Sequence, residues 1–143
     1  MSRLWFSLLG AALILFGAQP ARAAEVATVS RILYINSYEP GNGWGDGIQG
    51  GIRDRLAASG KATELSVEYL DSRRFAAPEL RDQQATLIAA KYARYKHDLV
   101  LVSDNAAFDF AIKHRQRLFP GRPIVFCGYN NFRPAVIEGI EHI

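Results

Sequence analysis

Short apolar runs alternate along the chain with longer amphipathic stretches, from Val29 almost to the last residue. Two of the runs are continuously apolar, which indicates strands that are buried on both faces of a sheet. A third run alternates apolar with polar residues, which indicates an edge strand with one wet face. Apolar residues at helical spacing predict amphipathic helices between the strands. The predicted strands are 31–36, 65–69, 98–103 and 123–126. The predicted helices are 44–58, 78 to near 96, and 104 or 105 to 118, with a short helix or turn at 133–140.

The order of these elements predicts an α/β fold. Strands that alternate with helices form parallel sheets, and their crossover connections are right-handed. With the second strand at an edge, the expected strand order is 2-1-3-4 in a doubly wound, Rossmann-like or flavodoxin-like sheet. Ligands of such sheets bind outside the carboxyl ends of the strands, where the strand order reverses. The loops after Asn36 and after Val102 are therefore expected to face one cleft.

The first residues of the chain differ from the rest. Arg3 is followed by an apolar run from Leu4 to Phe16 and then by the small-residue site Ala21-Arg22-Ala23. The run is shorter than the roughly 20 residues that a membrane-spanning helix needs. We therefore predict that residues 1–23 are a secretory signal peptide, cleaved after Ala23, and that the mature chain is periplasmic or secreted.

Composition and charge narrow the range of partners. The chain is 49% hydrophobic and 22% charged, as is usual for a globular protein. Loss of the leader would take the 17 basic residues to 15 against 14 acidic ones, a net charge of about +1. Such a chain has no electrostatic footprint for nucleic acid, so no nucleic-acid partner is predicted. Cys127, the single cysteine, is expected to be a small buried hydrophobe at a strand end.

Gly45, Gly47 and Gly50 form the pattern G-x-G-x-x-G, which is typical of dinucleotide-binding turns. In that fingerprint the first glycine directly follows the strand, whereas Gly45 comes nine residues after Asn36. Asp71 lies near the place of a ribose-binding acid, but the loop is too long, and we predict no nucleotide cofactor. The glycines have a structural interpretation instead. Some permit a turn, and others let the helix approach the sheet closely (Gly41 and Gly43; Gly47, Gly50 and Gly51).

Other catalytic patterns do not occur in the sequence. A phosphotransfer receiver needs an acidic pair after the first strand, where this chain has Asn36-Ser37-Tyr38. There is no G-x-S-x-G nucleophile elbow, and His97, His114 and His142 lack the spacing of zinc ligands. His97 and His114 are expected in solvated or capping positions near helix ends. We therefore predict no catalytic residue, no metal site and no cofactor.

Four segments, in this order and spacing, resemble the opening of a periplasmic binding domain of the type I fold. They are N-S-Y-E-P-G-N-G-W at 36–44, Y-L-D-S-R-R-F at 69–75, V-S-D-N-A-A at 102–107 and L-F-P-G-R-P-I-V-F-C-G at 118–128. The resemblance covers about residues 30–143. It is to the group shared by ABC-transporter substrate-binding proteins and the extracellular sensor regions of histidine kinases. It implies two α/β lobes that close on a small-molecule ligand.

The resemblance also implies which residues of this chain face the ligand. Tyr38, Trp44 and Tyr129 could stack on an apolar or aromatic body, Asp104 could pair with an amine, and the helix start after Asp104 could receive an anion. A structural role is the alternative: packing for Trp44, a core contact for Tyr38 and an N-cap for Asp104. The implied ligand-binding residues are Ser37, Tyr38, Trp44, Asp71, Ser103, Asp104, Asn105, Tyr129 and Asn130.

Residues 24–143 have the length of one such lobe, so we expect the N-terminal lobe only, with the second lobe missing. The expected function is non-catalytic solute binding, with an ABC permease or a fused membrane signalling domain as the partner. Two alternatives stay open. One is a small secreted α/β enzyme with Asp104 or Asp71 as a general base, and the other is an interaction module that associates through the face of a missing lobe.

Overall fold

Strand β1 (Ser30–Asn36) lies at the centre of the molecule, and its residues from Ile32 to Asn36 are all buried. It belongs to a computed structural model that describes residues 28–143. The predicted signal peptide lies outside the described residues. A strand buried on both faces requires continuous apolar sequence, which accounts for the run that predicted β1.

Four parallel strands form the sheet in the order β2-β1-β3-β4. The predicted α/β fold and strand order are therefore confirmed. Asn36 lies opposite Tyr69 and Ser103, and Ser103 lies opposite Cys127, so the carboxyl ends of all four strands are level. The remaining strands are β2 (Thr63–Tyr69), β3 (Leu99–Ser103) and β4 (Ile124–Cys127).

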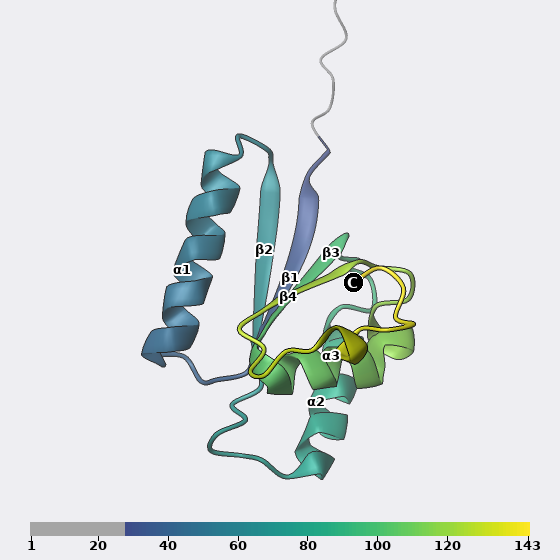
Figure 1. Ribbon diagram of the computed structural model, residues 1–143. Coiled ribbons are helices and arrows are strands. Elements are labelled where there is room, and N and C mark those ends of the chain that lie inside the picture. Colours follow the sequence, from purple (N-terminus) through teal and green to yellow (C-terminus); the bar gives the residue numbers. More distant parts are fainter. Residues whose placement is uncertain (1–27) are drawn as a thin grey trace, which may run out of the picture.

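Helices cover the two faces of the sheet unequally (Figure 1). Helix α1 (Gly43–Ala58) lies on one face beside β2 and β1, and α2 (Pro78–Lys91) and α3 (Asp104–Leu118) lie on the other. The side chain of Asn42 caps α1 by accepting a hydrogen bond from the Gly45 amide. A short 3₁₀ turn, η1 (Pro134–Val136), follows β4.

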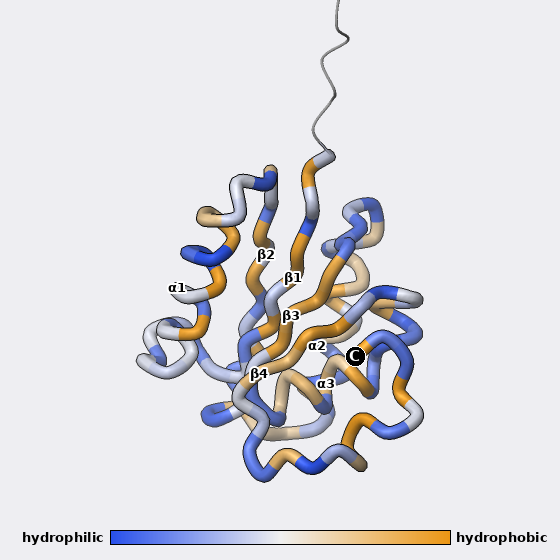
Figure 2. The backbone as a smooth tube through the Cα atoms, turned by 45° about the horizontal axis from the view of Figure 1, so that its top comes forward, coloured by the Kyte–Doolittle hydropathy of each residue, from blue (hydrophilic) through white to orange (hydrophobic). Residues whose placement is uncertain are grey.

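The hydrophobic core lies between the sheet and helices α2 and α3. The strands contribute buried aliphatic side chains, and α3 contributes small and aromatic ones. Figure 2 shows β1, β3 and β4 as largely hydrophobic, as strands inside a core must be. On the α1 side, Val125 of β4 is 53% exposed, so that part of the sheet face is open. The core residues are Leu33, Ile35, Leu70, Ala85, Ile88, Val100, Val102, Ala107, Phe108, Phe110, Ala111, Phe119 and Ile124.

One predicted helix length was wrong, because α2 ends at Lys91 rather than near Lys96. The short helix or turn expected at 133–140 is confirmed as the 3₁₀ turn η1, followed by a turn at 138–139. After α2 the chain turns so that the rings of Tyr92 and Tyr95 both pack edge-on against His97, which a continued helix would prevent.

The expected role of the later helix glycines was also wrong. A Cβ atom placed on Gly47, Gly50 or Gly51 would meet no heavy atom within 4 Å, so these residues do not bring α1 close to the sheet. The close approach occurs at Gly45, where a Cβ would lie 2.7 Å from Asn36 Nδ2. Gly41 does serve a turn, because its φ of +89° is readily adopted only by glycine.

Candidate functional site

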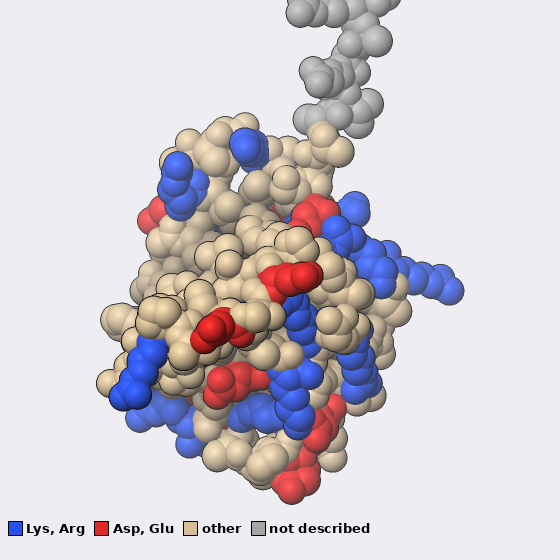
Figure 3. Space-filling view, turned by 45° about the vertical axis from the view of Figure 1, so that its right-hand side comes forward, with Lys and Arg blue, Asp and Glu red and all other residues tan. Residues whose placement is uncertain are grey.

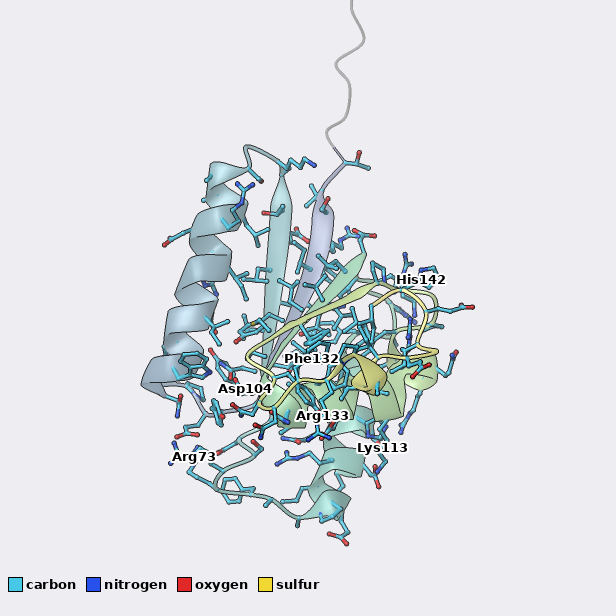
Figure 4. The ribbon with its side chains drawn as sticks, viewed as in Figure 1. Arg73, Asp104, Lys113, Phe132, Arg133 and His142 are labelled. Atoms are coloured by element: carbon cyan, nitrogen blue, oxygen red, sulfur yellow. The ribbon has the colours of Figure 1, made fainter. Side chains whose placement is uncertain are left out.

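Asp104 lies where the strand order reverses, at the carboxyl end of β3 (Figure 4). Its backbone has a φ of +67°, in the left-handed region that is uncommon for residues other than glycine. Only 5% of the residue is exposed. Ser103 occupies the N-cap position of α3 and makes no side-chain cap, so the N-cap alternative for Asp104 was wrong. The carboxylate instead faces the loop that follows β1 and the first turn of α1.

Two aromatic side chains, Tyr38 in that loop and Trp44 in the first turn of α1, donate hydrogen bonds to the Asp104 carboxylate. Trp44 Nε1 lies 3.1 Å from Oδ2 and 3.3 Å from Oδ1, and the Tyr38 hydroxyl lies 3.3 Å from Oδ1. Trp44 is nevertheless 60% exposed, so the packing alternative for this residue was wrong. The group formed by Tyr38, Trp44 and Asp104, here termed the Asp104 cluster, combines a buried carboxylate with an exposed indole surface.

Burial and hydrogen bonding act on the Asp104 carboxyl in opposite directions. Burial raises its pKa above the usual value, and the hydrogen bonds from Trp44 and Tyr38 partly offset that effect. The pKa of the Tyr38 phenol is raised by burial and then by the neighbouring Asp104 charge. The cluster therefore holds one desolvated acid beside two neutral donors, whose hydrogen bonds favour the charged form of the carboxyl.

Ser37 ties the loops after β1 and β3 together beneath the cluster. Its hydroxyl donates to the Ser103 carbonyl at 2.6 Å and accepts from the Ala107 amide at 2.8 Å. The Tyr34 hydroxyl lies 2.8 Å from Ser103 Oγ, and burial raises the pKa of this tyrosine to about 12. The two loops were expected to face one cleft, and these bonds place them side by side. Ser37 and Ser103 are fully buried, so they position the cluster from below.

Two further residues beside the cluster escaped the sequence analysis. Asn36 is fully buried, accepts from the Tyr38 amide at 3.0 Å and leaves its own Nδ2 without a partner among the described residues. Gly128 has a φ of +69°, and a Cβ there would lie 3.4 Å from Asp104 Oδ1. In the sequence, Asn36 is simply the polar residue that ends a predicted strand. No local pattern indicates that Gly128 lies beside Asp104.

The other implied residues lie at the same end of the sheet but outside the Asp104 cluster. Asp71 has a φ of +52° and pairs with Arg74. That hydrogen bond lowers the pKa of Asp71, which makes it a poor general base. Of the neighbouring arginines, Arg73 is exposed and lies below Asp104 in Figure 4.

The segment after β4 is held in place by contacts of Tyr129, Asn105 and Asn130. The Asn130 amide donates to Asn105 Oδ1 at 2.9 Å. The Tyr129 ring packs edge-on against Phe108 at 5.1 Å, and Phe132, labelled in Figure 4, completes this aromatic group. These contacts fix the chain at the rim of the sheet, while the stacking surface nearest Asp104 is Trp44.

Comparison of the chain with protein-family models, curated proteins and solved structures found no match. Between residues 28 and 143, no three His, Cys, Asp or Glu side chains come together as metal ligands would. No helix in the same range has the length and apolar character needed to cross a bilayer.

Three other expectations about single residues were wrong. His97 and His114 were expected in solvated or capping positions, but both are more than nine-tenths buried. Burial lowers the pKa of each imidazole. Cys127 was expected to be buried and is exposed, because β4 is an edge strand whose α1-side face is open. Burial of its thiol by neighbouring atoms still raises the pKa of Cys127.

Proposed function

We propose that residues 24–143 form the N-terminal lobe of an extracytoplasmic binding domain of the type I periplasmic-binding fold, which takes a small solute. The observation that carries the proposal is the Asp104 cluster, a desolvated carboxylate at the strand-order reversal with an exposed indole beside it. Ligands of doubly wound sheets bind at this reversal. The sequence resemblance implies a second lobe, which would close over the same end of the sheet.

The chemistry of the cluster favours a ligand with a cationic amine. Asp104 supplies the negative charge, and the exposed face of Trp44 supplies a surface on which a cation or its apolar body can lie. The start of α3 is less suited to an anion than its sequence indicates, because the Ala107 amide already donates to Ser37. An ammonium group would share the Asp104 oxygens with Tyr38 and Trp44.

The test is a titration of the full chain with methylammonium chloride and with tetramethylammonium chloride, each compared with sodium chloride at equal ionic strength. One lobe encloses only part of a ligand, so the expected Kd is about 1 mM or weaker. Quenching of Trp44 fluorescence reports binding. The fluorescence that remains in the Trp44→Phe variant comes from Trp5, the second tryptophan, and is subtracted from that of the parent chain. Methylammonium can donate hydrogen bonds and tetramethylammonium cannot, so the pair separates carboxylate pairing from stacking.

The matched variants are Asp104→Asn and Asp109→Asn. Both remove an α3 carboxylate whose pKa burial raises, but only Asp104 accepts from Trp44. Asp104→Asn should abolish the ammonium response, and Asp109→Asn should leave it unchanged. An equal response in the two variants, or none in the parent chain, would refute the proposal.

The same lobe could deliver its ligand to a transporter or report the ligand to a signalling domain. The coding sequence after Ile143 distinguishes these two roles. A second α/β lobe followed by a membrane helix and a phosphoacceptor-histidine helix would indicate a kinase sensor. A second lobe followed by a stop would indicate a transporter's receptor. Only a ligand with different affinities for the open and closed forms would drive the signal in either case.

A further inference from the structure

A cavity of about 230 Å³ lies at the opposite end of β3 from Asp104. It opens between the residues that follow α2, the end of α3 and the segment that leads into β4. Sites for drug-sized ligands occupy roughly 300–1,000 Å³, so this cavity suits a smaller molecule. Its lining is Ile88, Ala89, Tyr92, Tyr95, Lys96, His97, Arg117, Leu118, Phe119, Pro120 and Arg122.

His97 is the buried polar group of this cavity. It is 7% exposed, and its Nε2 has no hydrogen-bond partner among the described residues. The rings of Tyr92 and Tyr95 hold the imidazole edge-on at 4.5 and 5.2 Å. Buried polar atoms in proteins are nearly always paired, so an unpaired one in a cavity wall indicates a place for an external partner.

The charged residues of the lining are all basic. Lys96, Arg117 and Arg122 line the cavity, and no acidic residue does. Arg117 lies in the last turn of α3, where a cation is favourable in any case, so Lys96 and Arg122 carry the argument. Within residues 28–143, neither of these two has an acidic side chain within 4 Å. Figure 3 shows basic side chains spread over this face of the molecule, with acidic ones between them.

We propose that this cavity is a second binding site, separate from the Asp104 cluster, for a small organic anion with a flat apolar body. The carboxylate or phosphate of the ligand would lie between Lys96 and Arg122. The flat body would pack against Tyr92, Tyr95 and Phe119. His97 would meet an oxygen of the ligand through its unpaired nitrogen.

The test uses benzoate and phenyl phosphate as probes, with benzyl alcohol and inorganic phosphate as controls. Nuclear magnetic resonance of the full chain follows the ring signals of His97, Tyr92 and Tyr95 during each titration. Both aromatic anions should shift these signals, with a Kd between about 10 μM and 1 mM. The proposal fails if neither anion shifts His97, or if benzyl alcohol binds as tightly as benzoate. It also fails if inorganic phosphate binds as tightly as phenyl phosphate.

The variants remove one exposed cation and one half-buried cation of the lining, Lys96 and Arg122. Lys96→Gln and Arg122→Gln should each weaken binding of the aromatic anions about two- to fivefold, as expected for loss of an exposed ion pair. Lys61→Gln removes an exposed cation far from the cavity in the sequence and should leave binding unchanged. Asp104→Asn should also leave it unchanged, which separates this site from the proposed amine site. Equal weakening in Lys61→Gln would show a general charge effect and would overturn the proposal.

Discussion

Gly45→Ala tests the contact that seats helix α1 on the sheet. The added Cβ would lie 2.7 Å from Asn36 Nδ2, 3.0 Å from Oδ1 and 3.2 Å from Cγ, all closer than normal packing. Overpacking of this kind costs about 1–3 kcal/mol. Replacing a helical glycine with alanine contributes about 0.5–1 kcal/mol in the other direction. We therefore expect a net loss of about 1–2 kcal/mol in the free energy of unfolding.

Gly47→Ala is the matched control, because it makes the same change two residues further along the helix where a Cβ meets nothing within 4 Å. It should stabilise the protein by about 0.5–1 kcal/mol. The difference between the two variants isolates the clash with Asn36, since the helix preference largely cancels.

Thermal unfolding followed by circular dichroism measures both variants, at about 4 °C of Tm for each kcal/mol in a chain of this size. Asn36 Oδ1 accepts from the Tyr38 amide, so displacement of Asn36 should also speed hydrogen exchange at Tyr38 in Gly45→Ala alone. If Gly45→Ala is as stable as Gly47→Ala, the close approach does not hold α1, and the reasoning is refuted.

Three other predictions concern buried or reactive groups. Ser37→Ala removes one partner from both the Ser103 carbonyl and the Ala107 amide. It should lower the free energy of unfolding, measured with denaturant, by about 1–3 kcal/mol. Ser59→Ala makes the same change at an exposed position and should lower that free energy less. Burial lowers the pKa of His97, so the unfolded chain takes up its proton first. Stability should therefore fall as pH drops below about 6.5, and His97→Gln should flatten that slope; an unchanged slope would contradict it. Cys127 should react with a thiol reagent without denaturant because it is exposed, and more slowly than free cysteine because its pKa is raised; reaction only after unfolding would contradict the exposed position.

The strand order could be predicted from two periodicity signals and the rule for crossover connections. A continuous apolar run such as 99–102 suits a covered strand, and the alternation at 65–69 suits an edge. Together with right-handed crossovers, these two signals leave few topologies. The meeting of the loops after Asn36 and Val102 followed from that topology. The conformation of Asp104 did not, because a left-handed aspartate has no sequence signature.

The errors lie where packing between distant segments decides the outcome. His97 was expected in solvent because it follows a helix, but Tyr92 and Tyr95 turn back over it. The buried side of α2 was not predicted: Leu80 and Leu87 are exposed, while Ala85 and Ile88 are buried. A helix of weak amphipathic character does not show from its sequence which side faces the core.

The hydroxyl of Ser37 couples the loop after β1 to the start of α3. Because one oxygen bonds both the Ser103 carbonyl and the Ala107 amide, the loop that carries Tyr38 and leads into α1 cannot move without displacing the first turn of α3. A displacement of this loop is therefore expected to reach α3, which contributes Ala107, Phe108, Phe110 and Ala111 to the core. The two loops are therefore expected to move together. Binding of a ligand at Trp44 should then slow hydrogen exchange at the Ala107 amide.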